Sequence, residues 1–171
     1  MSLRQKLIDT LFYDSLFRGL DFKTVLDVGS GNGKMIDYFE SRGKKVTAID
    51  LAPTRKDIIK MDIFKNNLKK NSFDLVYSAH VIEHLKEPEK FAEELFGLSK
   101  KYVCIITPYP SVHFWDQPDH IRPYTPETLK RIFHLDETIH CFHLSIPLFE
   151  SISIILFEKQ QSRMSKKGVK K

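Results

Sequence analysis

Short apolar runs alternate with amphipathic stretches along most of this chain. Four of the runs have the length of a strand and lack polar alternation, as expected for strands covered on both faces. These runs are residues 24–28, 45–50, 73–78 and 101–108. Apolar residues recur at helical spacing in residues 2–20, 34–41 and 88–98. This alternation predicts an α/β domain with a mainly parallel sheet.

The second half of the chain adds an antiparallel element. Thr125 is a typical N-cap and Pro126 suits a first helical turn, so a helix should begin at Pro126. Two further strands, at about 137–146 and 151–158, are close enough in sequence to pair as a hairpin. A strand at 57–63 follows the one at 45–50 so closely that a crossover helix barely fits between them.

Charge divides the chain into a nearly neutral domain and a basic end. The 171 residues carry a formal net charge of +5, and residues 159–171, KQQSRMSKKGVKK, hold six Lys or Arg and no acid. Removing these six positive charges takes the count from +5 to −1. We predict a single domain over residues 1–158, followed by a basic and flexible tail. The tail is also where contact with nucleic acid or an acidic partner would be expected.

The composition favours a cytoplasmic protein. No apolar run reaches the roughly 18 residues of a membrane helix. The N-terminal stretch MSLRQKLIDTLFYDSLF contains acids and lacks the cleavage site of a secretory signal. Two cysteines, Cys104 and Cys141, do not make a disulfide framework. We therefore expect cytoplasmic localisation and no membrane partner, and the sequence predicts no particular oligomeric state.

A glycine-rich loop follows the first predicted strand, in the sequence VLDVGSGNGK. A P-loop would need a Ser or Thr after Lys34 and a glycine at Val28, and neither is present. The dinucleotide fingerprint would need a glycine at Lys34, although one substitution does not exclude it. The pattern that fits is D-x-G-x-G-x-G, with Asp27 directly before the turn. A carboxylate there would repel a pyrophosphate and attract a cation, which favours S-adenosylmethionine, a sulfonium without phosphate.

Two further acids end the next strands. Asp50 ends the strand at 45–50, where a carboxylate can accept hydrogen bonds from both ribose hydroxyls. Asp62 ends the third predicted strand, within reach of an adenine amino group. Because ligands bind at the carboxyl ends of the strands in such sheets, Asp27, Asp50 and Asp62 are expected to share one site.

The order of these motifs resembles that of class I S-adenosylmethionine-dependent methyltransferases. The resemblance rests on VLDVGSGNGKMIDYF, VTAIDLA, DIIKMDIF, FDLVYSAHVIEHL and VCIITPYPS. DHIRPYTPETLKRIF is similar to a segment of small-molecule methyltransferases of that superfamily, and the whole match covers about residues 22–135. The resemblance implies a Rossmann-like, three-layer α/β/α fold with a seven-stranded sheet whose last strand is antiparallel.

The resemblance also assigns the residues that bind the cofactor. Those it places around S-adenosylmethionine are Asp27, Gly29, Ser30, Gly31, Asp50, Leu51, Asp62, Ile63, Ser78, Ala79 and His80. The glycine loop would line the methionine part, Asp50 would hold the ribose, and Asp62 would meet the adenine edge. The crossover helix that barely fits before residues 57–63 is a departure from the family, and implies a more open adenine pocket.

The stretch HVIEHL, which begins at His80, matches H-x-x-E-H, an inverted zinc-peptidase motif. Such a site requires a long helix and a further carboxylate ligand downstream, and the run KEP that follows here interrupts a long helix. In the resembling family the same stretch is a turn and short helix that closes over the methionine end. We therefore expect no metal site, and we expect His84 to pack or hydrogen-bond locally.

Histidines are the candidate catalytic residues. Sulfonium donors are already activated, so the protein mainly aligns nucleophile, methyl group and sulfur, whereas a hydroxyl or ammonium acceptor must also lose a proton. His80 is nearest the expected methyl group. The loop PYPSVHFWDQPDHIRPY offers His113 and His120 beside aromatic side chains, at the correct edge of the sheet for an acceptor. The catalytic candidates are His80, His113 and His120.

These features predict an S-adenosylmethionine-dependent methyltransferase that acts on a small molecule. The Asn/Asp-Pro-Pro-aromatic tetrad of base-amine methyltransferases is absent after the strand at 73–78, where SAHV stands. Two alternatives remain open. One is an RNA or protein methyltransferase that uses the basic tail, and the other is a non-catalytic partner subunit with the same fold.

Overall fold

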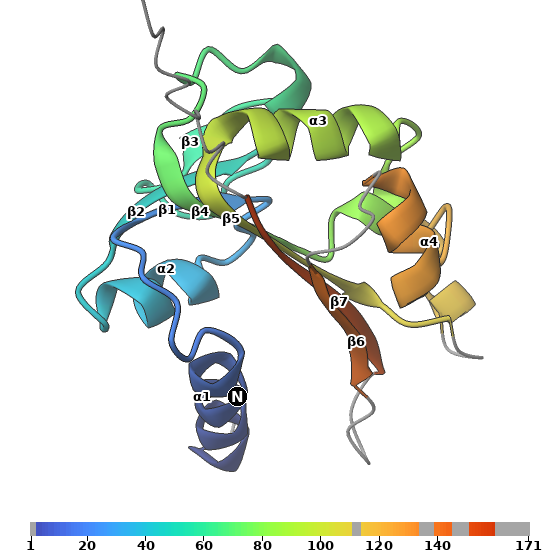
Figure 1. Ribbon diagram of the computed structural model, residues 1–171, viewed down its shortest axis with the longest axis horizontal. Coiled ribbons are helices and arrows are strands. Elements are labelled where there is room, and N and C mark those ends of the chain that lie inside the picture. The colour runs from blue at the N-terminus through green and yellow to red at the C-terminus, as the bar shows by residue number, and fades with distance from the viewer. Residues whose placement is uncertain (1–2, 111–113, 134–138, 145–150, 160–171) are drawn as a thin grey trace, which may run out of the picture.

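The computed structural model describes residues 3–110, 114–133, 139–144 and 151–159. In this part of the chain, seven strands form one sheet in the order β3-β2-β1-β4-β5-β7-β6 (Figure 1). The strands are β1 (Thr24–Val28), β2 (Lys45–Asp50), β3 (Ile59–Lys60), β4 (Phe73–Ala79), β5 (Ser99–Pro108), β6 (Ile139–Leu144) and β7 (Ile152–Glu158). Strands β1 to β5 pair in parallel, and β7 pairs antiparallel with β5 and β6. The predicted sheet with its C-terminal hairpin is thus confirmed.

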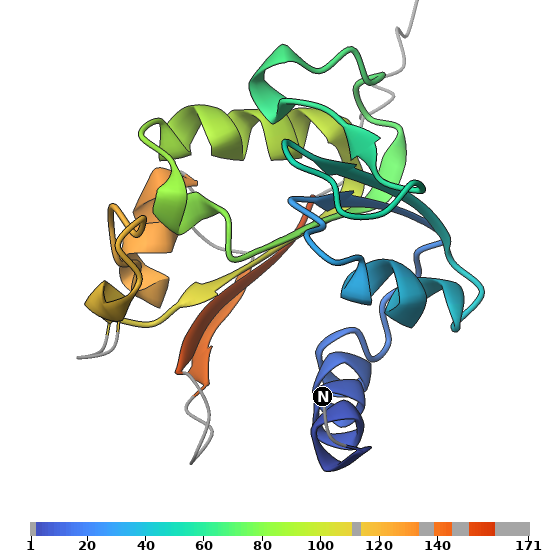
Figure 2. The ribbon, with the colours of Figure 1, turned by 180° about the vertical axis from the view of Figure 1, so that it is seen from behind.

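Helices cover both faces of this sheet. Helices α1 and α2 lie on one side, and α3 and α4 lie on the other (Figures 1 and 2). The helices are α1 (Leu3–Leu16), α2 (Lys34–Glu40), α3 (Pro88–Leu98) and α4 (Pro126–Ile132), with 3-10 turns η1 (Ile63–Lys65), η2 (Ile82–His84) and η3 (Phe114–Asp116). Successive residues of β1 serve the two layers: Val25 packs in a core with Phe39 of α2. Leu26 packs in a second core with Phe91 of α3, which confirms the three-layer α/β/α fold.

Two elements are shorter than the sequence predicts. Helix α1 ends at Leu16 rather than residue 20, because Gly19 adopts a left-handed φ of +79°. Strand β3 is two residues long instead of covering 57–63. Before it, Asp57 forms an ion pair with Arg55, and after it, Asp62 caps η1 rather than extending the strand.

Residues 51–58 connect β2 to β3 without a helix, as the sequence predicts. Arg55 ties this segment to α2, since its guanidinium donates to the Asp37 carboxylate at 2.8 Å and to the Gly33 carbonyl at 3.1 Å. The Thr54 hydroxyl donates to the Gly31 carbonyl at 2.9 Å. Polar contacts thus hold this segment to the glycine loop and to α2.

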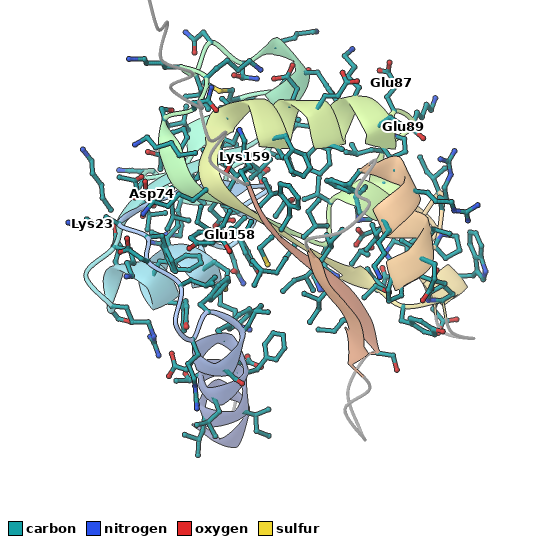
Figure 3. The ribbon with its side chains drawn as sticks, in the orientation of Figure 1. Lys23, Asp74, Glu87, Glu89, Glu158 and Lys159 are labelled. Carbon is teal, nitrogen blue, oxygen red and sulfur yellow. The ribbon has the colours of Figure 1, made fainter. Side chains whose placement is uncertain are left out.

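Lys159 is the last residue that the structure describes, and it lies close to the end of α3 (Figure 3). Its ammonium donates to the carbonyls of Phe96 and Ser99 at 3.0 and 2.8 Å, and to the amide oxygen of Asn71 at 3.0 Å. A cation is favoured at this end of a helix by the helix dipole. The sequence assigns Lys159 to the basic tail, and the rest of that tail lies outside the described residues.

The helices of the described ranges were compared with the length and hydropathy of a membrane-spanning helix. None of them is both long enough and apolar enough to cross a bilayer.

Candidate active site

The loop after β1 is built on three glycines with a left-handed backbone. Gly29, Gly31 and Gly33 have φ angles of +75°, +53° and +76°, which side chains rarely tolerate. The amide of Gly29 donates to the Ile49 carbonyl at 2.9 Å, which ties the loop to the end of β2. A Cβ atom at Gly29 would lie 2.3 Å from Cγ2 of Val81, so the loop also packs directly against the turn after β4.

Gly29→Ala should destabilise the fold, and Gly19→Ala provides a matched control. We expect Gly29→Ala to lower the free energy of unfolding by about 2–4 kcal/mol, combining backbone strain with overpacking against Val81. Gly19 has a similar φ of +79°, but nothing lies within 4 Å of its Cβ position. Its substitution should therefore cost only about 1 kcal/mol. Urea denaturation measures both values, and equal losses would show that the contact with Val81 contributes nothing.

A pocket of about 470 Å³ opens beside this loop, at the carboxyl ends of β1, β2 and β4. The predicted cofactor residues that line it are Gly29, Gly31, Asp50, Leu51, Asp62, Ile63 and His80. The lining residues not predicted to bind the cofactor are Val28, Ile49, Met61, Phe64, Val81, His84 and Leu85. Most of this second group is apolar and lies next to a predicted cofactor residue in the sequence. That proximity in sequence is the signal from which these residues could have been predicted. The strand order reverses between β1 and β4, and ligands bind at such points.

Asp50 is fixed at the end of β2 by two backbone amides. Its carboxylate accepts hydrogen bonds from the amide of Gly31 at 2.9 Å and from the amide of Ala52 at 2.8 Å. A carboxylate has about four acceptor sites, so capacity remains for hydroxyl groups of a ligand. The role of Asp50 in holding the ribose stays a prediction, and the geometry adds a structural role for this residue.

The other end of the pocket combines an acid with apolar surface. The Asp62 carboxylate accepts the amide of Phe64 at 2.9 Å and so caps η1. Ile63 is buried beside it, whereas Leu51 keeps 65% of its surface exposed. An exposed leucine on a pocket wall provides apolar surface that a planar base could cover.

Asp27 does not line the pocket but is buried next to the glycine loop, with 2% of its surface exposed. One of its carboxylate oxygens, Oδ2, has no hydrogen-bond partner among the described residues. Burial raises the pKa of Asp27 to about 7; the nearby Asp50 adds to the rise and a hydrogen bond from Ser30 opposes it. A buried, unsatisfied carboxylate oxygen is costly, and a cationic ligand group would offset that cost.

Three further predicted cofactor residues contribute structure rather than pocket surface. The Ser30 hydroxyl donates to the Asp27 carbonyl, and the Ser78 hydroxyl donates to the Val28 carbonyl, both at 2.9 Å. Ala79 packs against the core on the α2 face of the sheet. None of the three lines the pocket. The two hydroxyls bind main-chain carbonyls and Ala79 packs against the core, so all three residues stabilise the backbone of the site.

His80 follows β4 in a strained conformation. Its φ is +56°, which is unusual for a residue with a side chain and is often found at functional sites. Its amide donates to the Ile106 carbonyl at 2.9 Å, which holds the backbone in place. The imidazole lines the pocket and leaves 47% of the side-chain surface exposed. Of the two catalytic candidates that the structure describes, His80 lines the pocket and His120 does not.

The stretch HVIEHL forms a 3-10 turn, η2, and not the long helix of a zinc peptidase. Glu83 is fully buried in it and accepts the Thr107 hydroxyl at 3.0 Å through Oε2. The Glu83 carbonyl also accepts the amides of Ile121 and Arg122, at 2.8 and 3.3 Å. The turn therefore joins β4, β5 and the following loop, and His84 hydrogen-bonds locally as predicted: its Nδ1 lies 3.1 Å from the Asp119 carbonyl.

The structure describes one of the two histidines predicted in the loop after β5. His113 lies outside the described residues. His120 is half-buried and lies against His84, with ring centroids 5.0 Å apart, and does not line the pocket. Trp115, one of the aromatic side chains of this loop, keeps 61% of its surface exposed. In the described part of the loop, His120 is thus brought to the η2 turn rather than to the pocket surface.

The fold and the pocket together resemble those of methyltransferase domains that use S-adenosylmethionine. The defining features are the seven-stranded sheet with its reversed β7, the glycine loop after β1 and the acid at the end of β2. Comparison with known families agrees, because residues 26–105 match the family described as "Methyltransferase domain". The family match over residues 26–105 and the fold support the class I S-adenosylmethionine-dependent methyltransferase superfamily that the sequence predicts.

Individual relatives are similar over shorter or more divergent stretches. A ubiquinone biosynthesis O-methyltransferase from Nitrosomonas europaea is 25% identical over 104 residues, which cover 52% of this chain and 44% of that protein. A malonyl-[acyl-carrier protein] O-methyltransferase from Salmonella typhimurium is 45% identical over 51 residues, 30% of this chain and 20% of that protein. The chain thus spans less than half the length of these curated relatives.

A solved structure extends the similarity in fold to nearly the whole chain. It is a SAM-dependent methyltransferase from Archaeoglobus fulgidus, with a TM-score of 0.74 at 19% identity. The match covers 92% of this chain and 95% of that one.

Proposed function

We propose that this chain binds S-adenosylmethionine in the pocket beside the glycine loop and transfers its methyl group to an oxygen of a small molecule. The observation that carries the proposal is the charge of the site. Among the residues that the structure describes, two acids, Asp50 and Asp62, line the pocket and no lysine or arginine does. An oxygen of Asp27 without a hydrogen-bond partner in the same part of the chain lies beside it. Such a site favours a cationic nucleoside and disfavours one that carries phosphate.

Placement of the cofactor follows from these groups. The ribose hydroxyls would donate hydrogen bonds to the free acceptor positions of Asp50. The adenine would cover Leu51 and reach Asp62, and the methionine part would extend along the glycine loop. The sulfonium would then lie near His80. This places the methyl group on the side of the pocket that His80 and His84 line.

The transfer itself requires alignment more than activation. Oxygen attacks the methyl carbon opposite the sulfur, the carbon–sulfur pair stays on sulfur, and the donor leaves as a neutral thioether. A hydroxyl acceptor must also lose its proton, and His80 is the histidine of the pocket wall with a backbone fixed for that task. An oxygen acceptor is supported by the names of both curated relatives, which are O-methyltransferases.

Calorimetric titration tests the cofactor assignment directly. We expect one equivalent of S-adenosylmethionine, and of its thioether product S-adenosylhomocysteine, to bind, while NAD⁺ and ATP bind far more weakly. A radiolabelled methyl donor with a panel of phenols, carboxylic acids and amines then tests the acceptor. Tight binding of NAD⁺ or ATP without competition from the thioether would overturn the proposal, and transfer only to amines would overturn its acceptor.

A further inference from the structure

Three side chains of metal-binding type converge beside the proposed cofactor pocket. Glu83 and His84 come from η2, and His120 comes from the loop between β5 and α4. One ligand atom from each of the three lies within 4.8 Å of the other two. Two of them belong to the H-x-x-E-H motif, and the third is brought in by the fold.

Glu83 is the member of this group whose side chain would gain most from a bound cation. Its side chain is fully buried, and its Oε1 has no hydrogen-bond partner among the described residues. No lysine or arginine of the described part forms an ion pair with it; the nearest basic atoms are Nδ1 of His80 at 3.5 Å and Nε2 of His84 at 3.9 Å. A buried carboxylate oxygen in this state is destabilising unless a cation compensates it.

His84 is oriented as a metal ligand would be. Its Nδ1 lies 3.1 Å from the Asp119 carbonyl oxygen and 3.3 Å from the Asp119 carboxylate, both of which only accept hydrogen bonds. The proton is therefore placed on Nδ1, which leaves a lone pair on Nε2, the atom that lies nearer Glu83. Metal-binding histidines usually donate their other ring proton to a carbonyl or carboxylate in this way.

We propose that Glu83 Oε1, His84 Nε2 and a ring nitrogen of His120 bind a divalent metal ion of the zinc type. Ligand atoms about 2 Å from zinc lie roughly 3–3.5 Å apart, so a small closing of the present distances completes the site. Two histidines and one glutamate leave a coordination position open, as in catalytic zinc sites.

The site would act on the acceptor, a role that rests on the proposed function. His84 lines the pocket, so the open position of the metal faces the region of the methyl group. A hydroxyl bound there has a lowered pKa and passes its proton to His80, which lines the same pocket. Its oxygen then forms the bond to the methyl carbon, while the carbon–sulfur pair remains on sulfur. The metal thereby favours oxygen acceptors over ammonium acceptors.

The sequence alone predicts no metal site, because the only metal-binding form of the motif that it indicates is that of the zinc peptidases. In that form both histidines lie on one long helix, and glutamate is the base. Here η2 turns the chain so that glutamate and one histidine face a common point. The Glu83 carbonyl accepts hydrogen bonds from the amides of Ile121 and Arg122, and these bonds hold the neighbouring His120 close to η2.

Metal titration of protein without a histidine tag tests the proposal. After treatment with EDTA and dialysis, we expect one equivalent of Zn²⁺ to bind, in competition with a chromophoric chelator. His120→Ala and Glu83→Gln should each weaken binding at least about tenfold. Asp116→Asn, which changes an exposed acid of the same loop, is the matched control and should bind as the wild type does.

Two outcomes would overturn the metal site. One is no saturable binding of Zn²⁺ by the wild type, which would mean that the cluster only pairs histidines with acids. The other is unchanged affinity in His120→Ala. Binding of S-adenosylhomocysteine in EDTA, measured on every variant, reports whether the fold survives and tests the cofactor pocket separately. Loss of that binding in the wild type would contradict the proposed function and leave the metal result to stand alone.

Discussion

Asp50→Ala should weaken the binding of S-adenosylmethionine by at least about 100-fold. Hydrogen bonds to a charged group contribute about 1.5–3 kcal/mol each, and the carboxylate would lose two from the ribose. Together they amount to about 3 kcal/mol or more, which corresponds to at least two factors of ten in the dissociation constant. Calorimetric titration of wild type and variant at the same pH gives the ratio.

The structural role of Asp50 sets the controls for this experiment. Its carboxylate also holds the amides of Gly31 and Ala52, so the free energy of unfolding must be measured in parallel. Asp57→Ala removes a nearby exposed acid that pairs with Arg55 and lies outside the pocket lining, and should leave affinity unchanged. If Asp50→Ala lowers stability but binds the cofactor normally, Asp50 only supports the loop and the ribose is placed wrongly.

Asp27→Asn should have opposite effects on stability and on cofactor binding. The pKa of Asp27 is raised by burial from 3.8 to about 7 in the ligand-free fold. The folded protein therefore binds this proton more tightly than the unfolded chain. The resulting stability is full below about pH 4 and is lost as the pH rises to about 7. Asparagine cannot ionise, so the variant should match wild type at pH 4 and exceed it at pH 8 by roughly 1–4 kcal/mol in urea denaturation.

Cofactor affinity should change in the other direction. A cationic ligand favours the ionised carboxylate, so wild-type affinity should rise between pH 5.5 and 7, with a proton released on binding. The variant should show no such dependence and bind about 10- to 100-fold more weakly at pH 7. S-adenosylhomocysteine keeps the ammonium and lacks the sulfonium. A pH dependence seen with both ligands identifies the ammonium as the partner of Asp27, and a flat profile with both contradicts the pairing.

The sequence predicted the fold well because the sheet is covered on both faces. Most residues of strands β1 and β4 are buried, so apolar residues dominate both strands, and this pattern is visible without knowledge of their neighbours. β3 lacks that signal: Ile59 and Lys60 are both exposed at the edge of the sheet. The short length of β3 depends on the ion pairs of Arg55 and on the capping of η1 by Asp62. The pattern of apolar and polar residues along the chain does not predict these contacts.

The site was predictable where backbone geometry demands particular residues, and less so where side chains meet through the fold. Gly29 and Asp50 follow from the loop pattern and line the pocket. Ser30 and Ser78 belong to the same motifs, but their hydroxyls are bound to main-chain carbonyls. The approach of His120 to His84 depends on a contact between η2 and a loop distant in sequence, which a pattern of spacings cannot reveal.

The missing helix between β2 and β3 has a consequence for turnover. The connection is fastened to α2 by Arg55, whose ion pairs with Asp37 and Asp57 involve side chains that are partly exposed. Exposed ion pairs of this kind contribute only about 0–1 kcal/mol each to stability. Displacing residues 51–58 from α2 therefore costs little free energy. Under the proposed function, the thioether product must leave after every cycle, and we expect a displacement of residues 51–58 to open its path while the sheet and the α3 layer stay intact.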